Sequence, residues 1–388
     1  MRRGSRLGLW LWSLAMTTSL GLSLAARADL AVVAGDDTIR VVDGEIVIDP
    51  EGQQTLSFID LMGEAPRLVS SIDVGNSLFG PPVNVAITPD RKIALLSQAL
   101  KVGETDNGPG LVPSNLVQVL DLEAEPPMVI DRVEVGLQPS GLSIHPDGTA
   151  ALVATVAGQA VVVLQIDGKD VSVAGKVDLG GDVTHVAFTP DGKQALATKF
   201  EDHFVAILDV DGTEVVHREP DIPVGLYPFN LAISPDGGLA IVANAGKGGR
   251  SDGHVDTVTV IDLDAEPPRI IDHITVGEAP EGIAFSPDGA IAVVGLLDGG
   301  DSPLDAHEYR SQGRIVVLGI DGKRVTEIEK ISLGGIPESL AFSPDGRWLL
   351  VGNLLDKTIS VLEVSGRKVR KTERTIPLPT QPSALRAQ

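Results

Sequence analysis

The segment LLDGGDSPLDAHEYRSQG, residues 296–313, gathers side chains that can bind a cation or move a proton. Asp298, Asp301 and Asp305 offer carboxylate oxygens, and His307 follows two residues later. Oxygen donors of this kind suit Ca²⁺, but the spacing lacks the D-x-[DN]-x-[DN]-G pattern and the closing glutamate of an EF-hand loop. We therefore predict no cofactor, and an irregular site for Ca²⁺ or another divalent cation is the alternative.

A second polar segment, residues 245–255, holds Arg250, Asp252 and His254. If folding brings it beside the first segment, His254 and His307 could converge on a transition metal; the alternative is that both histidines are solvated. The chain has no cysteine, which excludes thiol chemistry, thiolate metal sites and C-x-x-C-H haem attachment. It also lacks a G-x-S-x-G elbow, an H-E-x-x-H motif and a P-loop.

The N-terminus has the pattern of a secretory signal peptide. Arginines precede an apolar run, and the small residues of Ala26–Ala28 (ARA) follow it. A membrane anchor is the alternative, but the run is short and Thr17–Ser19 interrupts it. We predict a signal peptide over residues 1–28, cleaved after Ala28, with no membrane span in the mature chain. The protein would then be periplasmic or secreted.

The charge balance excludes one class of partner. The net charge is −22, and the predicted leader holds four arginines but no acid, so the mature chain would be still more negative. Nucleic-acid binding requires a basic surface, so we predict no nucleic-acid partner. About 360 mature residues exceed one ordinary core, which indicates two domains or a repeat.

The sequence is repetitive over residues 83–352. Six segments share an apolar run, a P-D-G or P-D-R turn and a second apolar run. Periods of roughly 40 to 60 residues are typical of propellers and solenoids. The segments are VNVAITPDRKIALLS, SGLSIHPDGTAALVA, THVAFTPDGKQALAT, FNLAISPDGGLAIVA, EGIAFSPDGAIAVVG and ESLAFSPDGRWLLVG.

Each repeat predicts four short strands, because its apolar runs have no helical spacing and are separated by tight turns. Four-stranded units packed radially form a β-propeller. The C-terminal QPSALRAQ matches only the start of a repeat, and residues 29–75 supply three more strands. We therefore predict an all-β, seven-bladed propeller over residues 29–388, as a single domain closed by a blade that both termini share.

The segments SPDG, VANA, VGNLLDKTISVLEV and VTVIDL resemble those of the YVTN-repeat propellers, a bacterial exported family related in fold to lactonase-type propellers. The resemblance covers nearly all of the mature chain, although the tetrapeptide YVTN itself is absent. It implies a fold more than a function, because the matching residues are turn and core positions. The low aromatic content, 3%, differs from that of WD-repeat propellers.

The predicted topology separates two faces. The P-D-G turns lie on one, where their aspartates are expected to act as turn residues. The other carries the long connections 35–54, 98–115, 245–255 and 296–313, a common place for binding sites on a rigid scaffold.

Polar residues at the start of the inner strands are predicted to surround the channel mouth on the long-loop face. Glu281 and Glu338 belong to consecutive blades and would lie side by side. Such a pair would raise its own pKa values or bind a cation; the alternative is that both carboxylates point into solvent. The candidate ligand-binding residues are Glu281, Glu338, Asn84, Asn230 and His185 at the mouth, with Arg250, Asp252, His254, Asp305, His307 and Glu308 on the loops.

We interpret the chain as an exported, monomeric binding or interaction scaffold that recognises a protein or a small ligand through this face. The alternatives are a lactone or ester hydrolase and an accessory propeller of a periplasmic redox system. In a hydrolase, Glu281 or His307 could act as the base and Arg250 could stabilise the oxyanion.

Overall fold

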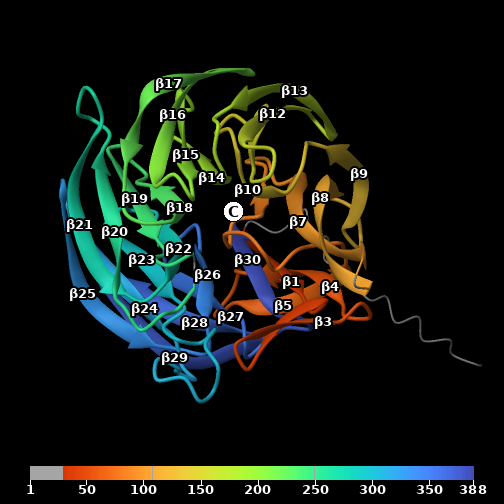
Figure 1. Ribbon diagram of the computed structural model, residues 1–388, viewed down its shortest axis with the longest axis vertical. Helices are drawn as coiled ribbons and strands as arrows, with labels where there is room; N and C mark the ends of the chain where they lie inside the picture. The colour runs from red at the N-terminus through yellow and green to blue at the C-terminus, as the bar shows by residue number, and fades with distance from the viewer. Residues whose placement is uncertain (1–28, 107, 249) are drawn as a thin grey trace, which may run out of the picture.

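The computed structural model describes residues 29–106, 108–248 and 250–388 as a ring of seven four-stranded antiparallel sheets around a central channel (Figure 1). This confirms the predicted all-β propeller. The predicted signal peptide lies outside the described residues. The described ranges contain no helix long and apolar enough to cross a bilayer.

Blades 1 to 4 follow one another along the chain, and each begins with its innermost strand. Blade 1 has β6 (Val85–Ile87), β7 (Ile93–Thr105), β8 (Gly108–Asp121) and β9 (Met128–Glu134). Blade 2 has β10 (Pro139–Ile144), β11 (Ala150–Thr155), β12 (Ala160–Asp167) and β13 (Asp170–Asp178). Blade 3 has β14 (Val183–Phe188), β15 (Gln194–Lys199), β16 (Phe204–Asp211) and β17 (Glu214–Pro223). Blade 4 has β18 (Pro228–Ile233), β19 (Leu239–Asn244), β20 (Asp256–Asp262) and β21 (Arg269–Gly277).

Blades 5 to 7 complete the ring. Blade 5 has β22 (Pro280–Phe285), β23 (Ile291–Leu296), β24 (Arg314–Asp321) and β25 (Arg324–Ser332). Blade 6 has β26 (Pro337–Phe342), β27 (Trp348–Asn353), β28 (Thr358–Ser365) and β29 (Lys368–Pro377). Blade 7 combines both ends of the chain as β30 (Pro382–Ala387), β1 (Leu30–Asp36), β4 (Gln54–Asp60) and β5 (Arg67–Asp73).

The ring closes as predicted, because β30 pairs antiparallel with β1 and becomes the innermost strand of blade 7. Val33 pairs with Leu385, and the backbones of Leu30 and Gln388 exchange two hydrogen bonds. In Figure 1 the C-terminus lies at the centre of the ring, beside the channel. Closure removes the unpaired strand edges that an open sheet would expose.

The apolar strands are buried on both faces because each blade packs between two others. In β23 every residue of IAVVGL is buried. Alternate side chains of this strand belong to different clusters: Ala292 and Val294 pack toward blade 4, whereas Ile291 and Val293 pack toward blade 6. Runs of Val, Ile and Leu without polar alternation are what such a doubly covered strand requires.

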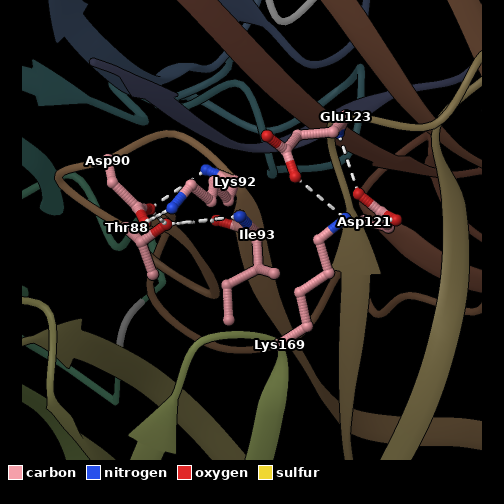
Figure 2. Close-up of polar contacts among 7 residues, drawn as sticks. All are labelled: Thr88, Asp90, Lys92, Ile93, Asp121, Glu123 and Lys169. Carbon is pink, nitrogen blue, oxygen red and sulfur yellow. Dashed lines mark hydrogen bonds and ion pairs between the residues drawn. The ribbon is translucent and has the colours of Figure 1, made fainter.

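The P-D-G and P-D-R turns use their aspartates as predicted, as structural hydrogen-bond acceptors. In blade 1 the Thr88 hydroxyl donates to Asp90 Oδ1 at 2.7 Å, and the Lys92 amide donates to the same oxygen at 3.1 Å (Figure 2). Thr88 Oγ1 also accepts the Ile93 amide hydrogen at 3.3 Å. The same hydroxyl-to-aspartate bond recurs in blades 3 to 6, so these turns fix the face opposite the long connections.

A lysine in the outer turn of blade 2 joins it to blade 1. Lys169 Nζ lies 2.7 Å from Asp121 Oδ2 and 3.0 Å from Glu123 Oε2 (Figure 2). Lys323 of blade 5 makes the equivalent contacts with Asp262 and Asp264 of blade 4. Solvent screens these exposed ion pairs, so the apolar interfaces between the blades supply most of the stability.

Two of the connections predicted as loops contain regular structure. In blade 1, β7 and β8 pair as far as Thr105 and Gly108, so residues 98–115 mostly extend the sheet. In blade 7, residues 35–54 include a hairpin of β2 (Ile39–Val42) and β3 (Glu45–Ile48). Both segments are long connections, as predicted, and strand pairing within them orders much of their length.

Candidate functional site

A cavity of about 340 Å³ opens on the face where the inner strands begin. We call it the upper cavity. The second residues of several inner strands line it, and Val41, Gly44 and Ile46 of the β2–β3 hairpin line its outer side. The inner-strand residues that line it are Ser140, Thr184, Phe229, Glu281 and Glu338.

Glu281 and Glu338 meet inside this cavity, as their equivalent positions in β22 and β26 predicted. Both side chains are buried, and their carboxyl groups form a hydrogen bond. The two strands approach closely because residue 282 is glycine: a Cβ there would lie only 1.6 Å from the Glu338 carbonyl oxygen. The alternative in which both carboxylates point into solvent was wrong.

Burial governs the protonation of this pair. It raises the pKa of Glu338 to about 8, and the nearby charge of Asp301 acts in the same direction. Burial, followed by the charge of Glu338, raises the pKa of Glu281 well above its ordinary value. The two carboxyls titrate as one unit, which retains its protons at neutral pH. At neutral pH the pair can therefore donate a hydrogen bond or a proton.

Asp301 and Arg250 bring opposite charges to the same cavity. Asp301 Oδ2 accepts the Ser251 amide hydrogen at 3.1 Å. This bond joins residues 296–313, the blade 5 connection, to residues 245–255, the blade 4 connection. The other oxygen, Oδ1, is buried, and it has no hydrogen-bond partner among the described residues. Arg250 lines the cavity from the blade 4 connection and is itself exposed. The lining of the cavity thus includes an unpaired acceptor and a cation in addition to the carboxyl pair.

The remaining wall is largely apolar. Phe79, Phe200 and Phe229 line it together with Leu297 and Ile336. The rings of Phe200 and Phe229 pack with their centroids 5.5 Å apart. Aromatic and aliphatic walls with a few polar groups at defined positions are typical of small-molecule pockets.

The β2–β3 hairpin lines the cavity and contacts the blade 5 connection, residues 296–313. Asp43 Oδ1 accepts the Leu304 amide hydrogen at 2.6 Å. The neighbouring Gly44 packs against the backbone of Pro303 so closely that a Cβ would lie 2.4 Å from its nitrogen. Sequence reasoning missed this contact because blades 7 and 5 are not neighbours in the ring.

Three residues predicted at the mouth lie elsewhere, outside the lining of the upper cavity. Asn84 is buried and donates to Asn76 Oδ1 at 2.9 Å. Asn230 is buried, and its Oδ1 accepts the Leu231 amide hydrogen at 2.8 Å. His185 lines the opposite end of the channel. Their predicted position was wrong: His185 and Asn230 are the third residues of their inner strands, one position beyond the residues that line the upper cavity, and Asn84 occupies the equivalent position of the repeat. Their binding role stays a prediction.

Apart from Arg250, the loop candidates also lie outside the lining of the upper cavity. The His254 side chain is 83% exposed and lies 3.2 Å from Asp252 Oδ1. Asp305 and His307 are exposed on the blade 5 connection. The chemistry suggested for the two histidines, and binding roles for these residues and for Glu308, stay predictions.

The blade 5 connection uses its first acid for structure. Both oxygens of Asp298 bind the guanidinium group of Arg314 in a two-pronged ion pair. Within residues 29–106, 108–248 and 250–388, no three Asp, Glu or His side chains are placed to hold a metal ion together. The divalent-cation alternative thus gains no site from the described part of the chain.

One repeat matches a family model. Residues 334–362, most of blade 6, match the model described as WD domain, G-beta repeat. The matched segment includes Trp348, the only tryptophan after residue 28. A search of curated protein sequences finds no significant match.

Solved structures of similar architecture support the fold. A candidate 6-phosphogluconolactonase of Bacteroides uniformis has a TM-score of 0.71 at 15% identity, covering 93% of this chain and 99% of its own. A periplasmic gluconolactonase of Pseudomonas aeruginosa has a TM-score of 0.66 at 19% identity, covering 93% and 99%. Hydrazine synthase of Kuenenia stuttgartiensis has a TM-score of 0.60 at 18% identity, covering 80% and 90%. At these identities the likeness extends to the propeller fold, and it includes proteins of unlike chemistry.

Proposed function

We propose that this chain is an exported binding protein that takes a small organic ligand into the upper cavity. The observation that carries the proposal is the pair of Glu281 and Glu338, buried and hydrogen-bonded inside a covered cavity. Burying two carboxyl groups is unfavourable unless they gain partners, so their retention in a lined cavity supports a role in recognition. A covered cavity of about 340 Å³ suits a small molecule better than a protein surface.

The lining defines the chemistry of the ligand. The protonated glutamates donate hydrogen bonds, so the ligand presents a carbonyl, ether or hydroxyl oxygen to them. Asp301 Oδ1 needs a donor, which a ligand hydroxyl or amine supplies. Phe79, Phe200 and Phe229 pack against an apolar part of the same molecule. The ligand class is therefore a small oxygen-bearing ring or chain with one apolar face.

Lactone hydrolysis is the second candidate, and the position of a proton donor favours it. A lactone ring oxygen beside Glu338 would receive its proton as the acyl–oxygen bond breaks, while Asp301 accepts a proton from the attacking water. Arg250 would stabilise the oxyanion of the tetrahedral intermediate. Two structural neighbours named as lactonases agree with this candidate in fold alone. In this mechanism Glu281 and Glu338 act as acids, because their raised pKa values keep them protonated at neutral pH.

A ligand screen tests the binding function. Saturation-transfer NMR with a library of oxygen-bearing fragments, including D-glucono-1,5-lactone and δ-decalactone, is run on the wild-type protein and on Ser140→Phe. Blade 4 already carries Phe229 at the position of Ser140, so this variant fills the cavity with a residue that the repeat accepts. Hits that bind the wild type and are lost in Ser140→Phe support the proposal. An unchanged set of hits, or none at all, overturns it.

Turnover separates the two candidates. Hydrolysis of both lactones is followed with a pH indicator in the wild type, the Glu281→Gln/Glu338→Gln variant and the exposed-acid control Asp305→Asn. Binding without hydrolysis supports a binding protein. If the wild type and Asp305→Asn hydrolyse a lactone and the double variant does not, the protein is an enzyme and the binding proposal is wrong.

A further inference from the structure

A second cavity, of about 520 Å³, occupies the opposite end of the channel. We call it the lower cavity. Its walls combine polar groups with apolar ones, among them Phe188, Phe285 and Phe342 near the ends of their inner strands. The prolines of the P-D-G turns also line it. Neither of the candidate functions above uses this space.

The charged side chains that line the lower cavity are two arginines, Arg386 and Arg91; Gln388, which carries the terminal carboxylate, also lines it, and no aspartate or glutamate side chain does so among the described residues. This composition is unusual for a chain with a net charge of −22. Burial without an acidic partner lowers the pKa of Arg386 to about 10, which leaves the guanidinium charged at neutral pH. Arg386 is half-buried in the channel and has no acidic side chain beside it in the lining, so an anion that enters the lower cavity can pair with its guanidinium.

Arg386 breaks the repeat pattern of the inner strands, and its side chain lines the channel. It is the fifth residue of β30, and the residue at the equivalent position of the repeat is small in each of the other six blades. Those small residues leave space at this level of the channel, into which one long side chain extends. They are Ala86, Ser143, Ala187, Ala232, Ala284 and Ala341.

Arg91 departs from the repeat in a second way. It occupies the turn position that is glycine in the other five turns, and its φ is 60°. A non-glycine residue in this left-handed region costs on the order of 1 kcal/mol. Its guanidinium lies 3.7 Å from Asp29 Oδ1, at the loose end of ion-pair distance, and its buried Nε has no partner among the described residues. Both exceptions to the repeat are thus arginines that line one cavity.

His185 adds a polar group to the same lining. Its side chain is 1% exposed, and its Nδ1 has no hydrogen-bond partner among the described residues. Burial and then the charge of Arg386 lower the pKa of His185 well below its ordinary value, so the imidazole is neutral. A neutral imidazole can donate to an anion without a second buried charge.

We propose that the lower cavity binds an apolar monocarboxylate, whose carboxylate pairs with Arg386 and whose hydrocarbon body packs against the phenylalanines. A carboxylate matches the planar fork of a guanidinium group. An aspartate follows each of the lining prolines, so the mouth is negative and disfavours polyanions such as phosphates. The site is separate from the upper cavity, so it stands or fails independently of the proposed function.

Calorimetric titration with octanoate tests the proposal on the full chain. We expect octanoate to bind the wild type, with a dissociation constant at least tenfold higher in Arg386→Ala and several-fold higher in Arg91→Gly. Both substitutions install the residue that other blades carry, so the fold should be retained, which the fluorescence melt of Trp348 checks. Arg386→Lys keeps the charge and should recover part of the affinity.

The controls separate carboxylate recognition from apolar binding. 1-Octanol should bind the wild type and Arg386→Ala equally, octyl phosphate should bind more weakly than octanoate, and Glu281→Gln should leave octanoate binding unchanged. Failure of octanoate to bind the wild type overturns the proposal. Equal affinity of octanoate for the wild type and Arg386→Ala would also overturn it. So would tighter binding of octyl phosphate than of octanoate to the wild type.

Discussion

Glu281 and Glu338 occupy the same position of consecutive inner strands, and their carboxyl groups form a hydrogen bond inside the upper cavity. The relationship follows from the repeat, because equivalent residues of neighbouring blades lie at the same height in the channel. Gly282 then allows the two strands to approach closely. Since both acids are buried and near Asp301, their charged forms are disfavoured, and the pair retains protons at neutral pH.

The pair should make stability depend on pH. The ordinary pKa of both glutamates is 4.5, and in the folded protein Glu338 rises to about 8, with Glu281 also raised. Between these values the folded state holds more protons than the unfolded state, so the free energy of unfolding falls as pH rises from about 4.5 to about 8. One pKa unit corresponds to about 1.4 kcal/mol, so the total effect is several kcal/mol.

Thermal melts of the Glu281→Gln/Glu338→Gln variant check this prediction. The amides cannot ionise, so the difference in Tm between variant and wild type should grow in the variant's favour from pH 5 to pH 8. Asp305→Asn, which removes an exposed acid, should follow the wild type at every pH. Parallel curves for the double variant and the wild type would contradict burial of the two carboxyls.

Gly282→Ala should destabilise the protein strongly. The new Cβ would meet the Glu338 backbone oxygen at 1.6 Å, and backbone atoms of a packed inner strand cannot move aside cheaply. We expect a loss of roughly 1–3 kcal/mol or more in the free energy of unfolding, measured by denaturant titration. Gly175→Ala is the matched control, because nothing lies within 4 Å of a Cβ at that position. Equal effects of the two substitutions would show that β22 and β26 are not in close contact.

The hairpin should hold the blade 5 connection over the upper cavity. Asp43→Ala removes the acceptor of the Leu304 amide hydrogen, so that amide should exchange with solvent several-fold faster. Asp43→Asn is the control: it keeps an acceptor oxygen and tolerates the φ of 51° at this position. The measurement is the exchange rate of the Leu304 amide hydrogen in the two variants. Equal rates in Asp43→Ala and Asp43→Asn would mean that other contacts hold the blade 5 connection.

Most of the fold could be predicted because the repeat is local. The run from Ser286 to Gly289 encodes the same turn as its counterparts, and the strands beside it are apolar throughout. The shared blade followed from one observation, that QPSALRAQ matches only the first strand of a repeat. The neighbouring positions of Glu281 and Glu338 followed from the same register. Topology alone therefore supplied the central pair of the upper cavity.

The rest depends on side-chain direction and on contacts between distant segments. His185 directly follows Thr184, yet the two residues line opposite cavities of the channel. The cover over the upper cavity forms between Asp43 and Leu304, which are far apart in sequence. One signal in the sequence could have been used: Arg386 interrupts a column of small residues, and comparison of the seven inner strands position by position identifies it.

Deleting residues 382–388 should destabilise the whole ring. The deletion removes β30, which pairs with β1 and contributes Ala384 and Leu385 to the apolar clusters on either side of blade 7. Without it β1 becomes an unpaired edge, and the channel loses one wall. We expect the Tm measured by Trp348 fluorescence to fall by more than 10 °C, or the chain to aggregate, since several kcal/mol are at stake in burial alone. A synthetic peptide TQPSALRAQ added in excess should restore much of the loss, and the same peptide with Leu385→Asp should not, because Leu385 is fully buried. A truncated chain that melts with the wild type would show that the termini do not close the ring.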